Sequence, residues 1–568
     1  MLGLAGLSAV YLASLLLKIA AYIKRKNLIL AKGMRRKRLI QIGFQAIKAE
    51  LPTIETDVAN KVLSASVSEL IAMRDSGALT CAQIVLSCMH RIIECDRKYH
   101  YVLDERFQAA YEEALACDRL LSEGKSKGVF TGIPFSVKDV YGCEGLITSF
   151  GCANLSDNVI ESDNVVISML KANGAVLLIK SSMGMLGVTA ENSNRIVGVT
   201  LNPWDETRVP GGSSGGDAVA VCTHSVPFAM GSDVGGSVRF PAAYCGLYTI
   251  KTSINRLSGQ GPVPRAGHPQ LFTSYGPLTR TVDDLVTICK ALITEKQHAA
   301  DPLIPPLPWK NELYQAKTPL RIGLVADCAF WPASAANKRV CRQAGDALAA
   351  IGHEIVPFDL GDVRELCELA CFFLFSSSEG GIKLKEEPPL AQHSHVVAVK
   401  LTPLWARGLF QWWYSRQLYS MVWKTLKDPN VRHYYQTVNR VLQLRREFYE
   451  KLRLAGIEAL LVPYPHPAFP HDMTPTLQYS CGYAIFANLF DLPAGHVPVD
   501  VVGTGEQTYP LVGDLNVDAT AKVMQGAQGL PIGVQVVTRR YQEEICLRVM
   551  KSLEDHFQFH KSLGDLGT

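Results

Sequence analysis

The chain has 568 residues, of which 48% are hydrophobic and 19% are charged. This balance supplies the apolar side chains of a large core and excludes an intrinsically disordered protein. The formal net charge is only +4, and no basic stripe beyond the N-terminal region indicates nucleic-acid binding. The 15 cysteines include no CxxC pair and no zinc-type grouping with histidine, so we expect reduced thiols and a cytosolic catalytic domain.

The N-terminal segment 2–23 carries one charge, Lys18, and is long enough to cross about 30 Å of hydrocarbon as a helix. A dense basic flank, 24–38, follows it, and the positive-inside rule keeps such a flank in the cytosol. The segment therefore predicts a single-pass membrane anchor. A cleaved signal peptide is the alternative, but the positive charges of a secretory signal precede its apolar run, whereas here they follow it.

The next part of the chain predicts helices and then a strand. Apolar periodicity over 58–94 indicates packing helices, and Thr80 is placed to cap the one that begins at Cys81. Segment 132–139, GIPFSVKD, alternates as a short strand does and carries Lys138 near its end. A lysine in this position is usually a solvated charge, so by itself it assigns no function.

Further helices and strands alternate as they do in α/β proteins. Segment 165–170 is predicted as a helix and 175–179 as a buried strand, followed by a loop-rich region at 181–198. Later strands are expected at 320–325, 353–358, 457–463 and 532–537, with helices at 340–350 and from Gln542.

Two glycine-flanked serines stand within residues 209–246, Ser213 in GGSSGG and Ser237 in GGS. Glycine on both sides of a serine lets backbone amides as well as the hydroxyl face a reacting group. A flexible linker is the alternative. A linker does not usually run on into apolar residues such as 218–221 and then repeat its glycine-serine theme.

Segment 404–424 carries four of the seven tryptophans, with Arg407, Arg416 and Lys424 among them. Aromatic residues interleaved with cations suit the headgroup boundary of a bilayer. The segment therefore predicts a second, monotopic membrane contact. A core helix or an oligomer contact is the alternative.

Lys138 and the two serines together resemble the amidase signature family. The matching pieces are GIPFSVKD around Lys138, PGGSSGGDAVAV around Ser213 and GSDVGGSVRFPAAYCGLYTIKTS around Ser237. Weaker matches, ALLVPYPHPA, NLFDLPAGHVPV and GLPIGVQVV, extend the resemblance over about 68–550. It implies an α/β amidase signature fold, with a large twisted mixed β-sheet core covered by helices on both faces.

The resemblance implies a Ser-Ser-Lys triad in which Ser237 is the nucleophile, Ser213 the bridging serine and Lys138 the base. A lysine can take a proton from a serine only if burial depresses its pKa, and a hydroxyl can relay that proton because it both donates and accepts. The oxyanion would be bound by the amides of Val234, Gly235, Gly236 and Ser237.

The charged residues near the triad are expected to support the structure of the site. Asp233 and Arg239 are expected to brace the Ser237 loop by charge-assisted hydrogen bonds. In the branch of the family that hydrolyses fatty acid amides, glutamate and threonine stand at the positions of Asp217 and Ser232. Both replacements are conservative.

Within the family, the chain resembles the membrane-anchored branch that hydrolyses fatty acid amides. The anchor, the Asn-Pro-Trp tripeptide at 202–204, the proline run at 305–308 and the aromatic segment carry this resemblance. It implies cleavage of N-acylethanolamines or primary fatty amides through an acyl-enzyme, a membrane-facing cap at 404–424 and a homodimer. No motif in the sequence requires a metal or an organic cofactor.

The resemblance also implies an acyl channel beside the triad. Leu374 and Phe375 match an acyl-channel pair, for which core packing is the alternative. Gly187 and Val188 replace bulkier side chains there, which leaves the preferred chain length open.

The predicted organisation is an anchor at 1–30, a basic linker and helix at 31–67, and a catalytic domain at 68–568. The endoplasmic reticulum or another endomembrane is the expected location. One alternative function is an amidase for small soluble amides or an amidotransferase-type subunit. Either enzyme would have little use for the apolar segment 2–23 or for the tryptophans of 404–424. The other is a catalytically silent membrane scaffold, against which the presence of Lys138, Ser213 and Ser237 argues.

Overall fold

The computed structural model describes the backbone of residues 2–261, 273–328, 330–375, 387, 390–393 and 431–563. Side chains are described for the same residues except 2–19, 375, 393, 478 and 562–563. The predicted membrane-facing segment 404–424 lies outside the described residues.

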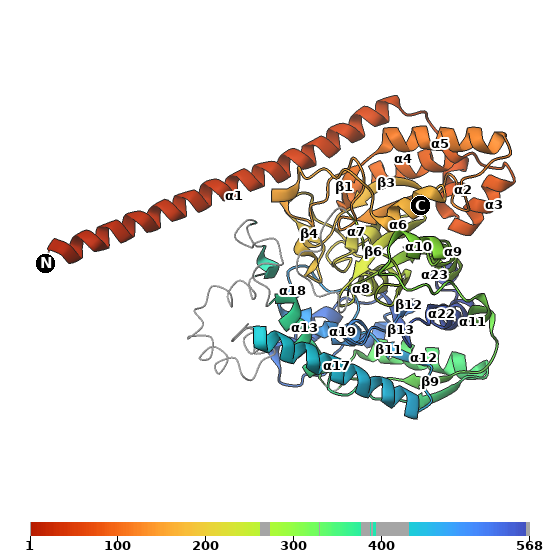
Figure 1. The fold of residues 1–568 in the computed structure, drawn as a ribbon. Helices are drawn as coiled ribbons and strands as arrows, with labels where there is room; N and C mark the ends of the chain where they lie inside the picture. The colour runs from red at the N-terminus through yellow and green to blue at the C-terminus, as the bar shows by residue number, and fades with distance from the viewer. Residues whose placement is uncertain are drawn as a thin grey trace.

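Within these residues, eleven strands form one mixed sheet, in the order β1-β3-β2-β6-β8-β7-β12-β13-β11-β9-β10 (Figure 1). A two-stranded sheet, β4-β5, lies apart from it. The strands are β1 Val102–Glu105, β2 Pro134–Lys138, β3 Val176–Ser181, β4 Ser193–Asn194, β5 Gly198–Val199, β6 Phe228–Asp233, β7 Tyr248–Lys251, β8 Ser274–Thr279, β9 Arg321–Leu324, β10 Glu354–Pro357, β11 Ala459–Pro463, β12 Ala494–Val501 and β13 Pro531–Thr538.

The central strands are buried at every residue, β2, β3, β6, β8 and β13 among them. Because successive side chains of a strand point to opposite faces, uninterrupted burial means that both faces of the sheet are covered. Strand β2 lies between β3 and β6 and runs parallel to both. This register places Lys138 opposite Ser181.

Helices cover the sheet (Figure 1). They are α1 Leu2–Glu50, α2 Thr56–Ser64, α3 Val67–Asp75, α4 Cys81–Tyr99, α5 Phe107–Ser122, α6 Val165–Ala172, α7 Gly215–Cys222, α8 Arg239–Cys245, α9 Val282–Leu292, α10 Glu295–Ala300, α11 Asn311–Gln315, α12 Ala335–Ala350, α13 Val363–Phe375, α17 Val431–Leu454, α18 Thr474–Leu477, α19 Gly482–Leu489, α20 Leu515–Asp518, α21 Thr520–Met524, α22 Glu543–Phe557 and α23 Phe559–Leu563.

The predicted elements are confirmed, with ends moved by a few residues. Helix α4 begins at Cys81 as expected, and Thr80 caps it through a capping box in which its side chain accepts from Gln83 N. The expected strand-helix-strand of the second half is β9, α12 and β10. The apolar residues 218–221 lie in helix α7. All fifteen cysteines are free thiols, in agreement with the expected reduced state.

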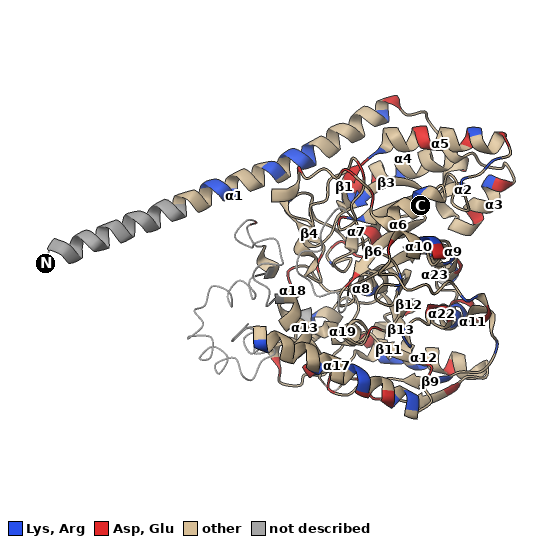
Figure 2. Cartoon of the chain, viewed as in Figure 1, with Lys and Arg blue, Asp and Glu red and all other residues tan. Residues whose placement is uncertain are grey.

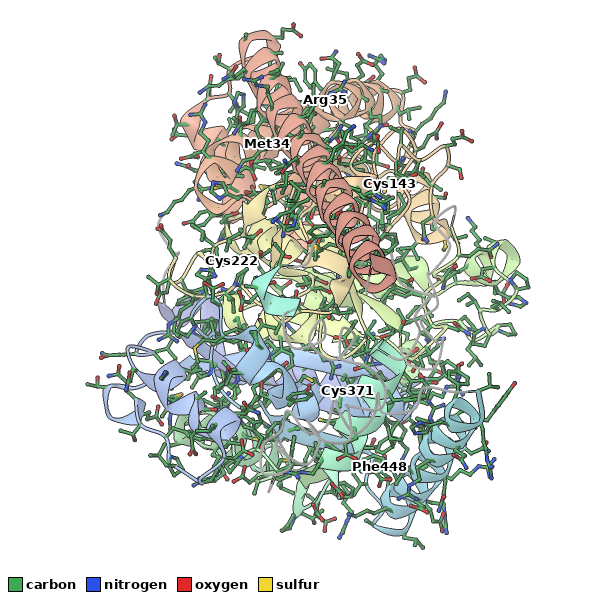
Figure 3. All side chains as sticks on the ribbon, turned by 90° about the vertical axis from the view of Figure 1, so that its left-hand side faces the viewer. Met34, Arg35, Cys143, Cys222, Cys371 and Phe448 are labelled. Carbon is green, nitrogen blue, oxygen red and sulfur yellow. The ribbon has the colours of Figure 1, made fainter. Side chains whose placement is uncertain are left out.

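Helix α1 runs unbroken from Leu2 to Glu50, and its N-terminal end extends away from the body of the molecule (Figure 1). Its second half packs on the body, where Phe44 stacks on Phe107 with ring centroids 5.7 Å apart. Figure 2 shows the described basic residues of α1 in blue. Figure 3 labels Met34 and Arg35 where α1 crosses the upper half of the molecule.

The residues with described side chains include no helix that is both long and apolar enough to span a bilayer. Nearly all of the predicted anchor, 2–23, falls outside those residues. Residues 31–50, predicted as part of a linker region, continue helix α1.

Candidate active site

Lys138 lies at the carboxyl end of β2, and only 1% of its surface is exposed. Its Nζ donates to Ser213 Oγ at 2.8 Å and to the carbonyl oxygen of Ser232 at 3.1 Å. Removal from water lowers the pKa of Lys138 to about 8, against the carboxylates of Asp217 and Asp233, which raise it. A lysine in this environment can accept a proton near neutral pH.

Ser213 lies in the loop that precedes α7 and is 2% exposed. The peptide bond between Gly212 and Ser213 is cis. A Cβ added to Gly212 would lie 2.5 Å from the carbonyl oxygen of Thr189, so the neighbouring backbone leaves room only for glycine. The glycine-rich loop is therefore a packed support that holds the Ser213 hydroxyl against Lys138, and it is not a linker.

Ser237 follows β6, in the turn that leads into α8, and it lines a cavity of about 70 Å³. Its carbonyl oxygen accepts a hydrogen bond from Ser214 N at 3.1 Å, which joins the two glycine-serine loops. Within the described part of the chain, its Oγ has no hydrogen-bond partner. The structure thus brings Lys138 into contact with Ser213 and places Ser237 on the adjoining loop, open to the cavity.

The turn that carries Ser237 is fixed by a buried ion pair. Arg239 donates to Asp233 through Nε at 3.1 Å and through NH2 at 2.9 Å, and both side chains are fully buried. Burial alone would raise the pKa of Asp233, but the Arg239 guanidinium and the Asn488 amide outweigh it and hold that pKa well below its usual range. Asp233 and Arg239 therefore brace the loop, as the sequence predicted.

The four amides predicted to bind an oxyanion differ in whether they already donate a hydrogen bond within the protein. Gly236 N donates to Asp233 Oδ1 at 2.8 Å, so this amide is already used inside the turn. The amides of Val234, Gly235 and Ser237 have no hydrogen-bond partner among the described residues. The Gly236 amide thus supports the turn, three further amides are open to a substrate oxygen, and the oxyanion role of all four stays a prediction.

The cavity beside Ser237 is lined mainly by apolar side chains, with a few hydroxyl groups among them. Leu374 lies in its wall, as predicted, and so do Gly187 and Val188; the side chain of Phe375 is outside the described part of the chain. None of the described residues that line it has a charged side chain. Further lining residues are Phe240, Tyr244, Phe469, Leu477 and Ile485. Such a pocket suits an uncharged, apolar group.

A larger cavity of about 590 Å³ lies between α1 and the C-terminal end of α4. Lys37, Phe44, Asp96 and Arg97 are among its lining residues. It contains no member of the predicted triad, so cavity size does not mark the reaction site in this molecule.

Sequence reasoning missed two features of the site. Ser480 and Cys481 line the cavity although no motif singled them out, and Ser480 Oγ lies 3.0 Å from His466 Nε2. Asp217, which the sequence presents only as a conservative replacement, is fully buried, and its charge raises the pKa of Lys138. Its signal in the sequence is a single acidic residue in an otherwise uncharged segment, GGDAVAVC.

Comparisons with known proteins identify the family of the chain. The family described as Amidase matches residues 83–547. Fatty-acid amide hydrolase 1 of Sus scrofa is 27% identical over 523 residues, which cover 90% of this chain and 88% of that relative. Fatty acid amide hydrolase 1 of Caenorhabditis elegans is 27% identical over 579 residues, covering 96% and 98% of the two chains.

A solved structure titled fatty acid amide hydrolase has the same fold, with a TM-score of 0.78, 21% identity and coverage of 96% of each chain. The family match covers most of the chain and includes Lys138, Ser213 and Ser237. The chain therefore belongs to the amidase signature family and is an amide hydrolase.

Proposed function

We propose that this amidase hydrolyses fatty acid amides, N-acylethanolamines and primary fatty amides, to a free fatty acid and an amine or ammonia. The observation that carries the proposal is the buried contact between Lys138 Nζ and Ser213 Oγ, 2.8 Å apart, beside an uncharged cavity that exposes Ser237. The relatives from Sus scrofa and Caenorhabditis elegans, which are named for this activity, support the same substrate class.

In the proposed mechanism, Ser237 Oγ attacks the amide carbonyl as its proton passes to Ser213 and the Ser213 proton passes to Lys138. A base is needed because a serine hydroxyl is a weak nucleophile at neutral pH. The free amides of Val234, Gly235 and Ser237 would stabilise the oxyanion, and loss of one such donor lowers kcat by roughly 10²–10³ in other hydrolases.

The same relay, run in reverse, supplies the proton that the leaving nitrogen needs. The acyl group then remains on Ser237 as an ester, and water attacks it after losing a proton along the same path. The product is a carboxylic acid, and the serine hydroxyl is restored.

The proposal includes attachment to an intracellular membrane, in the endoplasmic reticulum or another endomembrane, with the catalytic domain in the cytosol as a homodimer. Helix α1 begins at Leu2 and its N-terminal end extends beyond the body, so a span at 2–23 would enter the bilayer while the body of the molecule stays on one side of it (Figure 1). The aromatic segment 404–424 would form a second contact beside the substrate entry.

The deciding experiment uses detergent-solubilised full-length protein, a fluorophosphonate probe and a long-chain acylethanolamide. We expect the wild type to be labelled and to release fatty acid, and Ser237→Ala to do neither. Labelling that survives Ser237→Ala would contradict the nucleophile assignment. Labelling without lipid hydrolysis would instead favour the alternative, an amidase for small soluble amides.

Membrane attachment is tested by liposome flotation of the full chain and of a variant lacking 1–30. We expect the full chain to float and the shortened chain to bind more weakly but measurably. A shortened chain that stays entirely in the soluble fraction would contradict the second contact at 404–424.

A further inference from the structure

Asp217 is a buried acidic residue that the proposed triad does not use. It stands in the first turn of α7, Gly215–Cys222, where every residue is buried and Asp217 is the only charged one. Its own exposure is 0%. An ionised carboxylate in such a place is costly unless other groups compensate it, so its presence calls for a physical reason.

The hydrogen bonding of this carboxyl group is incomplete. Oδ1 accepts from Ser181 Oγ at 2.6 Å. Oδ2 is buried and has no hydrogen-bond partner in the described part of the protein. Burial raises the pKa of Asp217 to about 7, against the Ser181 hydrogen bond and the charges of Lys138 and Lys180, which lower it.

The residue that holds Asp217 also lies next to Lys138. Ser181 ends strand β3, and the parallel register of β2 and β3 pairs it with Lys138. Lys138 Nζ makes its two hydrogen bonds to Ser213 Oγ and to the Ser232 carbonyl oxygen. Among the described residues, no hydrogen bond or ion pair joins the lysine to the carboxyl group, but both are buried, and in such surroundings the charge of each acts on the other through space.

The remaining charges around this site have partners of their own. Asp233, the second anion that acts on Lys138, is bound by Arg239 at 2.9 Å. Lys180, the second cation that acts on Asp217, lies 3.4 Å from Asp139. Asp217 is thus the acidic group acting on Lys138 that has no ion-pair partner of its own among the described residues.

We propose that Asp217 is a positioning residue for amide hydrolysis, whose carboxyl group, held by Ser181, is a buried negative charge that acts on Lys138 through space and sets the pH above which the lysine acts as a base. The proposal rests on the proposed role of Lys138. Asp217 touches neither the substrate nor Ser237, and it acts only through the lysine.

The proton balance of the step is simple. The Ser237 O–H bond breaks as its oxygen bonds to the carbonyl carbon, Ser213 takes that proton and passes its own to Lys138 Nζ. The ammonium that forms is stabilised by the Asp217 carboxylate while the oxyanion exists. When the leaving nitrogen takes the proton back through Ser213, the pair returns to its starting state.

The test is the pH dependence of kcat and of kcat/KM for an acylethanolamide with full-length wild type and Asp217→Asn. Asparagine keeps the shape but removes the negative charge that raises the pKa of Lys138. We therefore expect the rising limb of both profiles to move about one pH unit lower, with little loss of rate well above the midpoint. Asp217→Glu keeps the charge and should leave the midpoint within a few tenths of a unit.

Asp284→Asn is the matched control. Asp284 is another fully buried aspartate, bonded to the backbone amides of Val67 and Ser68, and it does not line the cavity. We expect the rate profile of Asp284→Asn to have the same pH midpoint as that of the wild type. If Asp217→Asn fails to fold, Ser181→Ala, which removes only the supporting hydrogen bond, replaces it in the same measurement.

The outcomes separate this proposal from the proposed function. An equal rate loss at every pH in Asp217→Asn, with an unmoved midpoint, would assign Asp217 a purely structural role and overturn the proposal. Full activity of Lys138→Met would instead overturn the role of the lysine, and the proposal would fall with it.

Discussion

Two buried pairs of opposite charge flank the glycine-serine loops, and they are built in contrasting ways. In the Asp233–Arg239 pair, the carboxylate accepts hydrogen bonds from two arginine nitrogens, from Gly236 N and from the Asn488 amide. In the Lys138–Asp217 pair, the carboxyl group accepts one hydrogen bond and one of its oxygens accepts none. Both aspartates are 0% exposed, so burial is not what distinguishes them.

The difference lies in the number of donors that each carboxyl group faces. Complete bonding holds the pKa of Asp233 below its usual range, whereas burial with a single donor raises the pKa of Asp217 to about 7. The first pair is permanently ionised and gives the turn its shape. The second can gain or lose a proton near neutral pH, which is what a base and its support require.

The largest expected effect that tests this contrast is on activity. Lys138→Met should lower kcat/KM for an acylethanolamide by about 10⁴, because no base then remains for Ser213. The free energy of unfolding in urea should change little, since Asp217, whose pKa is raised to about 7, can take up a proton when the lysine charge is lost.

Lys251→Met is the control for that variant. Lys251 is also 0% exposed, and its Nζ donates to the carbonyl oxygen of Thr252 at 2.8 Å, away from the cavity. Its catalytic rate should stay within about tenfold of the wild type. An equal loss of activity in both variants would mean that the loss follows from removing any buried lysine, and not from removing the proposed base.

The next effect is on stability. Arg239→Met should lower the free energy of unfolding by about 3–5 kcal/mol, because it leaves Asp233 buried and without its counter-charge. Urea unfolding followed by circular dichroism measures this, with the exposed Arg453→Met, which loses only a surface pair with Glu450, as the unaffected reference. A small change in Arg239→Met would remove the distinction between the two pairs.

The third effect is the pH dependence of stability. The folded-state pKa of Asp217 lies above its unfolded value of about 3.9, so its contribution to stability is fully present below about pH 4 and is lost as the pH rises to about 7. Relative to the wild type, Asp217→Asn should therefore gain on the order of 4 kcal/mol between pH 4 and pH 7. Parallel urea curves at pH 4.5 and 7.5 check this, and a constant difference would contradict it.

The smallest effect concerns the single hydrogen bond that supports Asp217. Ser181→Ala should destabilise the fold by about 1 kcal/mol. Because the hydrogen bond lowers the pKa of Asp217, its loss raises that pKa, and the rising limb of the rate profile should move down by a few tenths of a unit. A profile identical to that of the wild type would exclude Ser181 from the proton balance.

Much of the sheet could be predicted from the sequence, because local patterns carry it. The alternation that ends at Lys138 is strand β2, and the cap at Thr80 opens α4 where it was expected. The glycine-serine loops could be singled out because a glycine run followed by apolar residues is unusual for a linker.

The Asp217–Lys138 pair could not be predicted in this way. The parallel pairing of β2 with β3 places Ser181 beside Lys138, and that pairing is set by packing across the sheet rather than by any local pattern. The use of Gly236 N by Asp233 was equally hidden, because the sequence does not reveal which way an amide points inside a turn. Leu374 could be placed in the cavity only through the family resemblance.

The bonds of Arg239 also link the site to the order in which the chain is synthesised. Its guanidinium donates to the carbonyl oxygen of Ala484 at 2.9 Å, to Asn488 Oδ1 at 2.6 Å and to Gln535 Oε1 at 3.0 Å. Lys138, Ser213 and Ser237 leave the ribosome long before these acceptors do. A nascent chain therefore contains the proposed nucleophile and base well before the turn that carries Ser237 can be fixed by all its hydrogen bonds, and we expect hydrolysis only after β13 has joined the centre of the sheet.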